Sequence, residues 1–319
     1  MTEPGSLFSE VNRIKEAVRR VVIGRDDPVE QVLCCLLAGG HVLLEGVPGL
    51  GKTLLAKTLA LLMDTRYKRI QFTPDLLPSD IVGTQVFNPQ TGAFSLHKGP
   101  VFTEILLADE VNRTPPKSQS ALLEAMEEGQ VTIEGNTTAL PELFFVIATQ
   151  NPVEYEGTYP LPETQLDRFM MKVLIDYPSK EAELAVMRNY AAGNELQYPD
   201  RLIDSPVISK ESILGFRRGL TQVVVKEELI DYMRKIVAAT RDPEFVRLGA
   251  STRAAVAVLK TARTLAAIRG MDFVTPEEIK DVVLPVLRHR VILRPEALID
   301  GLVPDYFLED ILRRVPVPR

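Results

Sequence analysis

The sequence predicts an α/β domain built on a largely parallel sheet, followed by a smaller all-helical domain. In the first half of the chain, short apolar runs alternate with helical patterns, which is typical of buried strands in a parallel sheet. These runs occupy residues 42–44, 105–108, 144–148 and 171–175. Beyond Pro178 only helical periodicity continues, so we expect one domain over 1–178 and a second over 179–319. A length of 319 residues suits two domains of ordinary size.

Two helices are expected before the first strand. From Val11 to Val21, apolar residues recur at helical spacing with charged residues between them. A second helical pattern follows Gly24 and ends at Gly39. A further helix, between the second and third apolar runs, is expected to be capped by Thr114 and to end at Gly129. Helices that alternate with short buried strands in this way cover both faces of a parallel sheet.

The second domain is expected to contain five helices. The helical patterns occupy residues 179–192, 210–220, 227–240, 252–268 and 276–291. The last one begins with a capping box formed by Thr275 and Glu278, with Pro276 between them. We see no strand pattern between these segments, so we predict that this domain is all-helical.

Composition and charge exclude several classes of protein. Hydrophobic residues make up 45% of the chain and charged residues 25%, which excludes a disordered or collagen-like chain. A net charge of −6 argues against a broadly basic surface for nucleic acid. No apolar run approaches the ~20 residues of a membrane span, and no signal peptide is visible. Cys34 and Cys35 are adjacent in an apolar stretch, so we expect them in the core and the protein in the cytoplasm.

The segment from Gly46 to Thr53 is a complete Walker A loop, Gly-Val-Pro-Gly-Leu-Gly-Lys-Thr. It leaves a predicted strand and enters a helix, so its backbone N–H groups and the helix N-terminus can surround a phosphate. Lys52 is expected to reach the β- and γ-phosphates of ATP, and the Thr53 hydroxyl to ligate Mg²⁺. The predicted nucleotide-binding residues of the loop are Gly46, Pro48, Gly49, Leu50, Gly51, Lys52 and Thr53.

Polar residues at the ends of two predicted strands supply the second half of this site. Asp109 and Glu110 end the second apolar run, and an acid at the carboxyl end of such a strand lies beside the phosphate loop. Asp109 is expected to hold Mg²⁺ and its waters, and Glu110 to polarise the attacking water as a general base. Asn151 follows the next strand and is placed to position that water.

Two arginines are candidates for stabilising charge on the γ-phosphate. Arg168 precedes the last predicted strand, and Arg253 begins a helix of the second domain. An arginine brought to the γ-phosphate can raise the rate by ~10³–10⁵. Taken alone, each would be explained more simply as a surface arginine; beside the other ATPase motifs, we expect Arg168 and Arg253 to assist Glu110 and Asn151 in catalysis.

Other polar residues carry no predicted chemistry. The three histidines, His41, His97 and His289, have no second ligand at metal-binding spacing, so no metal site is expected among them. Short basic clusters are expected to be solvated, and no aromatic residues interleave with them as in a single-strand nucleic-acid platform. These clusters lie at residues 19–20, 68–69 and 288–290.

Taken together, these motifs resemble the AAA+ ATPases and, within them, the MoxR family of the helix-two-insert clade. The resemblance covers residues 11–293 and includes three further stretches: 99–102, 112–119 and 159–163. It implies a P-loop AAA+ αβα core followed by a helical lid. It also implies Mg-ATP hydrolysis by a homo-oligomeric ring, usually hexameric, with ATP at the subunit interfaces.

The resemblance also assigns roles to individual residues. Asn151 would be sensor one, Arg168 the finger that acts on the neighbouring subunit's ATP, and Arg253 sensor two from the lid. The segment formed by Val22, Ile23 and Gly24 matches the one that lines the adenine pocket of the family. Arg113 lies just past the catalytic acids and is a further candidate to face the neighbour. Whether Arg253 and Arg113 act on their own or a neighbouring site stays open.

Two hairpins are expected to interrupt the core. One runs over 86–96 with a turn at 88–92, and the second over 131–140 with a turn at Gly135. In related rings such insertions point toward the central pore and contact substrates. The alternative is that they only extend the edge of the sheet.

The resemblance implies chaperone-like remodelling, assembly or maturation of client proteins. The partners of this family are often proteins with von Willebrand factor A domains. Two alternatives stay open: an ATP-gated adaptor that recruits a partner without threading it, and a nucleic-acid motor. The acidic charge and the absence of a recognisable DNA-binding module favour a protein partner over nucleic acid.

Overall fold

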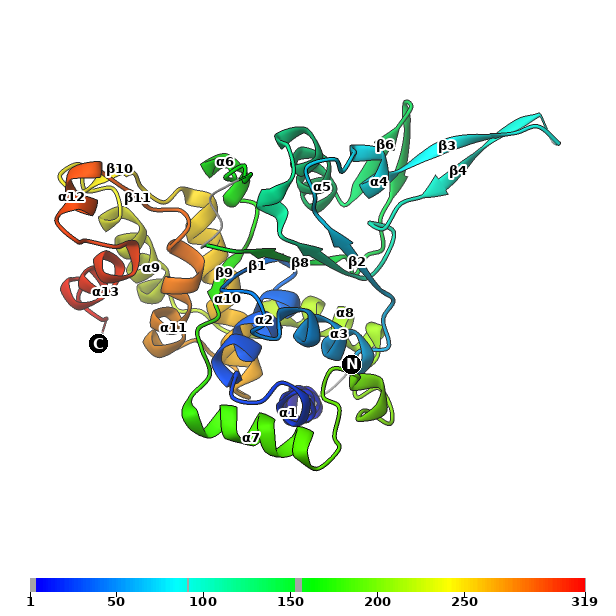
Figure 1. Cartoon of the computed structure of the whole chain (residues 1–319). Coiled ribbons are helices and arrows are strands. Elements are labelled where there is room, and N and C mark those ends of the chain that lie inside the picture. The colour runs from blue at the N-terminus through cyan, green and yellow to red at the C-terminus, as the bar shows by residue number, and fades with distance from the viewer. Residues whose placement is uncertain (1–3, 91, 153–156, 319) are drawn as a thin grey trace.

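A computed structural model describes residues 4–90, 92–152 and 157–318 of the chain. Its centre is a five-stranded sheet in the order β2-β5-β8-β1-β9, and every pair of neighbours in it is parallel (Figure 1). The strands are β1 (Val42–Glu45), β2 (Tyr67–Gln71), β5 (Ile105–Asp109), β8 (Phe145–Gln150) and β9 (Met171–Leu174). The predicted α/β class with a parallel sheet is confirmed.

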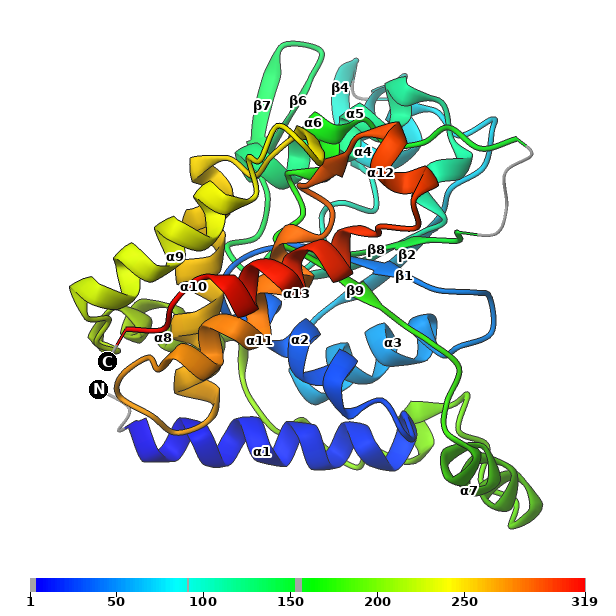
Figure 2. The same cartoon turned by 90° about the vertical axis from the view of Figure 1, so that its left-hand side faces the viewer.

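Alternate residues of the central strands pack into two separate hydrophobic cores, one on each face of the sheet. Leu43 and Leu106 belong to one core, whereas Val42 and Leu107 belong to the other. The first core is covered by α4 (Pro78–Val82) and α5 (Pro116–Glu128). The second is covered by α1 (Pro4–Val21), α2 (Asp26–Leu37) and α3 (Lys52–Leu62), which lie below the sheet in Figure 2. Burial on both faces explains why these strands read as continuous apolar runs.

Strand β2 was not among the predicted strands. It lies at the edge of the sheet and reads Tyr-Lys-Arg-Ile-Gln, with Ile70 as its one buried residue. An edge strand with charged side chains lacks the apolar run that identifies the inner strands. Helix α5 also begins differently from the prediction, because Pro115 rather than Thr114 is the residue that precedes it. The predicted end at Gly129 is confirmed.

The five helices predicted for the second half of the chain are present. They are α7 (Lys180–Ala191), α8 (Lys210–Gly219), α9 (Glu227–Ala239), α10 (Thr252–Ile268) and α11 (Pro276–Leu287). The capping box of Thr275 and Glu278 is confirmed, whereas α11 ends before the predicted residue 291. Two short helices follow, α12 (Pro295–Ile299) and α13 (Pro304–Arg314), together with a small antiparallel pair, β10 (Val246–Leu248) and β11 (Ile292–Leu293). Strands this short carry no periodic signal, so the pattern did not predict them.

Both predicted hairpins are present and extend away from the sheet. β3 (Gly83–Asn88) pairs with β4 (Ala93–Lys98), and β6 (Gln130–Ile133) pairs with β7 (Asn136–Ala139). Figure 1 shows the β3–β4 hairpin as the longest projection of the molecule. A short helix, α6 (Glu163–Leu166), precedes β9. No helix in the described part of the chain is long and apolar enough to cross a membrane.

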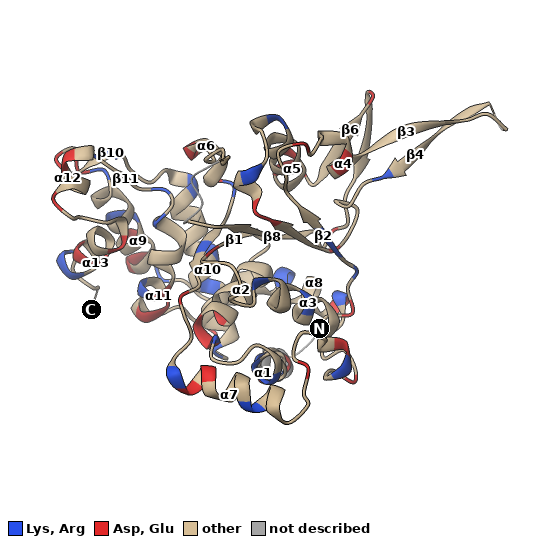
Figure 3. Ribbon diagram, viewed as in Figure 1, with Lys and Arg blue, Asp and Glu red and all other residues tan. Residues whose placement is uncertain are grey.

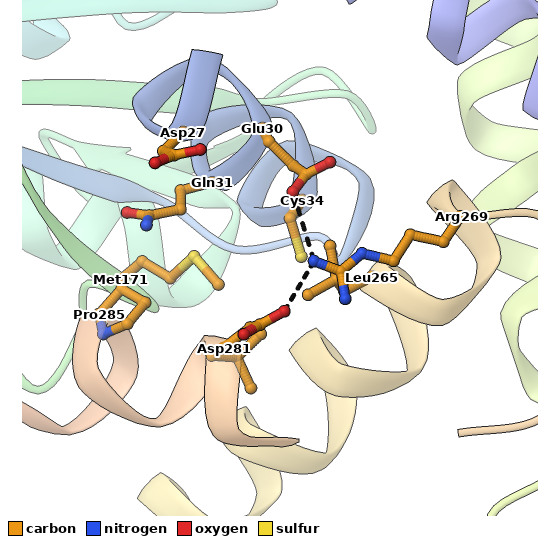
Figure 4. A pocket seen from close by; sticks show the side chains of 10 residues that line it. Asp27, Glu30, Gln31, Cys34, Met171, Leu265, Arg269, Asp281 and Pro285 are labelled. Atoms are coloured by element: carbon orange, nitrogen blue, oxygen red, sulfur yellow. Dashed lines mark hydrogen bonds and ion pairs between the residues drawn. The ribbon is translucent and has the colours of Figure 1, made fainter. Parts of the chain in front are cut away.

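Helices α10 and α11 meet the α/β core through an ionic contact. Arg269 at the end of α10 pairs with Glu30 of α2 at 3.6 Å and with Asp281 of α11 at 2.7 Å (Figure 4). These residues border a cavity of about 250 Å³ whose lining includes Cys34.

Burial raises the pKa of the Cys34 thiol well above its usual value. Both cysteines are buried, as predicted.

The basic cluster at 288–290 is not solvated, so that prediction is wrong. Positive and negative residues are interspersed over most of the fold (Figure 3), but His289 and Arg290 are only 6% and 7% exposed. Arg288 pairs with Asp305 of α13 at 2.9 Å. A side chain after the end of a helix can turn back into the structure, which helical periodicity alone does not reveal.

Stability should fall below neutral pH because of His41. Its Nδ1 accepts from the Val146 N–H at 3.0 Å and its Nε2 donates to the Met126 carbonyl oxygen at 3.1 Å, a pairing that needs the neutral ring. Burial lowers its pKa to about 4. The unfolded chain, with a histidine pKa near ~6.5, therefore binds protons that the folded chain does not, and stability decreases from about pH 6.5 toward 4.

We expect His41 to account for ~2 kcal/mol of lost unfolding free energy between pH 8 and 5. Urea unfolding at both pH values measures this difference. His41→Asn should reduce the pH dependence by this amount, while buried His289, whose pKa is also lowered by burial, keeps its own contribution. The same change at exposed His97 should leave the pH dependence as in the wild type. An equal pH dependence in His41→Asn and wild type would contradict the assignment.

Candidate active site

The Walker A loop has an open, positively polarised interior. Gly49 and Gly51 both have φ of +82°, and a β-carbon placed on either would meet no other described atom within 4 Å. A left-handed backbone of this kind favours glycine and turns N–H groups to one side. Gly51 immediately precedes α3, so the helix dipole adds positive potential at the same point. Lys52 Nζ donates to the Gly46 carbonyl oxygen at 2.6 Å, which holds it across the loop.

One cavity of about 480 Å³ brings most of the predicted residues together. Its lining includes Pro48, Gly49, Gly51, Lys52, Thr53, Asp109, Glu110 and Asn151. The parallel register explains this meeting, because the loop follows the carboxyl end of β1 while Asp109 and Asn151 stand at the same edge, at the ends of β5 and β8. Gly46 is packed closely beneath the loop, since a β-carbon there would lie 2.4 Å from the Ile175 carbonyl oxygen.

Asp109 is held by two side chains that the sequence analysis did not single out. Thr149 Oγ1 donates to Asp109 Oδ1 at 2.6 Å, and Arg69 Nη2 lies 2.6 Å from Asp109 Oδ2. Arg69 belongs to the cluster predicted to be solvated, and its side chain is 47% exposed, so the ion pair with Asp109 forms at a solvated surface. The register between β2 and β5 is the signal that could have identified Arg69, because it places Gln71 opposite Asp109 on the neighbouring strand.

Glu110 lies in a conformation that few non-glycine residues adopt, with φ of 59° and ψ of 51°. Its backbone N–H donates to Thr149 Oγ1 at 2.8 Å, which stabilises this turn. Its Oε2 accepts from Gln71 Nε2 at 2.7 Å and from Arg113 Nη1 at 3.1 Å. The carboxylate is therefore aimed into the cavity, and Arg113, considered above for a neighbour, contacts Glu110 of its own chain.

The donor set suits a hard divalent cation. Thr53 and Asp109 line the same cavity and offer a hydroxyl and a carboxylate, the oxygen ligands that Mg²⁺ prefers. Magnesium bound there would neutralise charge on the phosphate oxygens. Asp109 already gives both oxygens to Thr149 and Arg69, so its carboxylate is oriented before any cation arrives.

A second cavity, of about 410 Å³, adjoins the loop on its apolar side. Its lining includes Val22, Ile23 and Leu50, with Pro178, Met187, Tyr190 and Leu196 from beyond β9. Gly24 lets α7 approach, because a β-carbon there would lie 2.4 Å from Ala182 Cβ. Met187 and Tyr190 are 68% and 45% exposed, so they offer an apolar surface on which the flat adenine ring of a nucleotide could pack. The residues from beyond β9 were not predicted.

Arg168 and Arg253 lie apart from the phosphate cavity. Neither is among the described residues that line it. Arg168 lies before β9, at the amino end of the sheet, since Met171 is paired with Val42 at the start of β1. The phosphate loop follows the other end of β1. Both arginines instead contact Glu127 of α5, Arg168 at 3.1 Å and Arg253 at 3.2 Å.

The segment that carries Arg168 is held by Arg290. Arg290 Nη2 donates to the carbonyl oxygens of Asp167 and Phe169 at 3.0 and 2.7 Å, and Nη1 donates to that of Met170 at 3.0 Å. His289 Nε2 adds a bond of 3.0 Å to the Phe169 oxygen. Residues that follow α11 thus fix the backbone on both sides of Arg168.

Comparisons with known proteins agree with this architecture. Residues 41–171 match the model of the ATPase family associated with various cellular activities (AAA), and residues 238–311 match the AAA lid domain. Chaperone MoxR1 of Mycobacterium tuberculosis is 42% identical over 325 residues, covering 98% of this chain and 84% of its own. The chain belongs to the MoxR family of AAA+ ATPases. The predicted family and the predicted ATPase activity are confirmed.

Two further relatives show the same full-length likeness. The uncharacterized protein YeaC of Bacillus subtilis is 46% identical over 303 residues, covering 95% of this chain and 93% of its own. A crystal structure described as that of a candidate ATPase from Cytophaga hutchinsonii superposes with a TM-score of 0.90 at 44% identity, covering 99% and 97% of the two chains. The likeness to these two relatives therefore extends over essentially the whole chain.

Proposed function

We propose that this MoxR-type ATPase works as a homo-oligomeric ring, hexameric as the family implies, that uses Mg-ATP to remodel client proteins in the cytoplasm. The observation that carries the proposal is that the phosphate-binding residues and the two candidate catalytic arginines lie at opposite edges of the sheet. One chain supplies the phosphate cavity, while Arg168 and Arg253 meet on Glu127 at the other edge of the sheet. Both arginines can contribute to hydrolysis if that edge faces the phosphate cavity of a neighbouring subunit.

The distance along β1 and β9 supports action on a neighbour. Four paired residues, Val42 to Glu45 and Met171 to Leu174, separate the two edges of the sheet. At ~3.3 Å per residue this is about 13 Å of strand alone, before the loops at either end. Arg168, whose flanking backbone is held by Arg290 at the amino end of β9, therefore lies at the opposite edge of the sheet from its own Walker A loop. In a ring, the same side chain can meet the loop of the next subunit.

Within one cavity the remaining groups have distinct tasks. The Walker A N–H groups and Lys52 bind the phosphates, and Thr53 and Asp109 would hold magnesium. Glu110, aimed into the cavity by Gln71 and Arg113, accepts the proton of the attacking water. Asn151, only 4% exposed, orients that water from the end of β8.

The β3–β4 hairpin is the element best suited to contact a client. Residues 83–97 contain no charged side chain, and the hairpin projects furthest from the core. Phe87 and Phe94 lie ring to ring at 5.3 Å and are 50% and 65% exposed. An exposed aromatic pair on an uncharged projection is costly in water and is typical of a protein-contact surface. We propose that clients, including those that work with von Willebrand factor A domain proteins, bind there.

Replacing Phe94 should separate client contact from hydrolysis. A Glu110→Gln variant held in ATP serves to capture the client, which is then purified and added to the wild-type protein. We expect the client to raise phosphate release by wild type, and Phe94→Ala to lose at least about 80% of that stimulation while its basal rate stays unchanged, as expected when one interface anchor is truncated.

Ile299→Ala is the matched control, because Ile299 of α12 is 84% exposed yet lies outside the hairpin. It should keep full stimulation. Stoichiometric ATP-dependent binding without stimulation would favour an adaptor instead. Retention on DNA at low salt, with DNA-stimulated turnover, would favour a nucleic-acid motor.

A further inference from the structure

The carboxylate of Glu127 joins two arginines that come from different parts of the fold. Arg168 Nη2 lies 3.1 Å from Glu127 Oε2, and Arg253 Nη1 lies 3.2 Å from Glu127 Oε1. Each arginine thus uses its own oxygen of one carboxylate. We call these three residues the Glu127 cluster. Arg168 precedes β9 of the core, Arg253 begins α10, and Glu127 stands in the last turn of α5.

Glu127 occupies a position where a carboxylate is unfavourable by itself. The C-terminal turn of a helix carries partial negative charge, and Glu124 and Glu128 add two further acids close by. Two nearby guanidinium groups compensate for this charge. Conversely, the two arginines repel each other, and the shared carboxylate offsets that repulsion. Each member of the cluster therefore depends on the others for its position.

The backbone beneath the cluster is well anchored. Helix α5 buries Leu123 and Met126 in the core, and Gly129 ends the helix with φ of 60°. Arg290 holds the carbonyl groups on both sides of Arg168. Ser251 caps α10 one residue before the helix begins, and it accepts from the Ala254 N–H at 3.3 Å. The three side chains thus extend from fixed points, and Glu127 and Arg168 both line a cavity of about 200 Å³.

We propose that Glu127 is a positioning residue for ATP hydrolysis: it holds Arg168 and Arg253 side by side so that both guanidinium groups meet the terminal phosphate bound by a neighbouring subunit. This inference rests on the proposed ring. Two donors that are already held in place do not have to be ordered during the reaction. Avoiding that cost is the main way in which preorganised hydrogen-bond donors lower the activation barrier. The carboxylate acts through the arginines and does not itself touch the nucleotide.

Glu127→Gln tests the assignment because it keeps the shape of the side chain and removes its charge. The amide can accept from one guanidinium but presents its N–H₂ group to the other. We expect kcat to fall by about 10- to 100-fold, the scale of a misplacement of roughly 1 Å. The KM for ATP, and nucleotide binding by the isolated subunit, should stay as in the wild type. Glu124→Gln, on the same helix and cavity, is the matched control and should keep the wild-type kcat.

Mixed rings separate a positioning role from a folding defect. Combined with Lys52→Ala subunits, Glu127→Gln should recover activity, because an intact cluster then faces an intact phosphate cavity at some interfaces. Combined with Arg168→Ala subunits it should recover none, since every interface then has a defective cluster. Ring formation of each mixture is checked by light scattering.

Three results would overturn the proposal: a wild-type kcat in Glu127→Gln, a loss of nucleotide binding by its isolated subunit, or no recovery with Lys52→Ala. A mixture of Arg168→Ala with Lys52→Ala subunits distinguishes failure of the Glu127 assignment from failure of the proposed ring. Recovery there without recovery for Glu127→Gln removes the role of Glu127 alone. Failure of both removes the proposed ring arrangement and the inference with it.

Discussion

Glu110→Gln should abolish turnover while leaving ATP binding intact. The amide cannot accept a proton from the attacking water, and loss of a general base lowers kcat by ~10²–10⁴. The amide oxygen can still accept from Gln71 or Arg113, so the side chain keeps its place in the cavity. The phosphate-binding groups on the other side of the cavity are untouched. Phosphate release and equilibrium binding of a fluorescent ATP analogue measure the two effects separately.

The matched control for this prediction is Glu296→Gln, which removes one exposed carboxylate from α12, away from the cavity. It should hydrolyse ATP at the wild-type rate. Equal rates in Glu110→Gln and wild type would show that another group accepts the proton. A loss of nucleotide binding would show instead that the substitution distorts the unusual backbone at Glu110, where φ is 59°.

Arg168→Ala should produce the second large effect, a fall in kcat of about 10³-fold at unchanged nucleotide affinity, since an arginine finger acts chiefly in the transition state. The affinity is expected to stay because the phosphate cavity of the same chain does not include this residue among its described lining. Arg313→Ala, on the exposed face of α13, is the control for loss of one arginine and should leave kcat unchanged.

Mixing Arg168→Ala with Lys52→Ala subunits decides which subunit the finger serves. Each variant alone should be inactive, and the mixture should regain activity at interfaces that combine an intact Arg168 with an intact Lys52. A mixed ring without any recovery would mean that Arg168 acts on its own subunit or only stabilises the fold. The opposite-edge position of Arg168 predicts recovery.

The strands and helices that bury large apolar surfaces could be read from the sequence, whereas β2 could not. The inner strands β5 and β8 are buried on both faces and therefore appear as apolar runs. β2 is recognisable only through its pairing with β5, which connects residues far apart in the chain. For that reason Arg69 and Gln71, which hold the two acids of the site, escaped prediction.

The charged residues at 288–290 show even more clearly that local spacing cannot predict contacts between residues far apart in the chain. A run of Arg-His-Arg looks like a solvated surface when only local spacing is considered. In the fold, Arg290 is 7% exposed and pairs with Asp167, more than a hundred residues earlier in the chain. Burial of a guanidinium is tolerable only when its donors are satisfied, and the carbonyl groups beside Arg168 satisfy them. No local pattern encodes such a long-range match.

The chemistry that depends on contiguous residues could be predicted from short sequence motifs. A Walker A loop needs its glycines, lysine and threonine in one short segment, and a strand that ends in Asp109 and Glu110 needs only local order. The tertiary structure alone decided which edge of the sheet each arginine occupies and which carboxylate they share. Parallel strands bring their carboxyl ends to one edge and their amino ends to the other, so the same connectivity that assembles the phosphate cavity keeps Arg168 away from it.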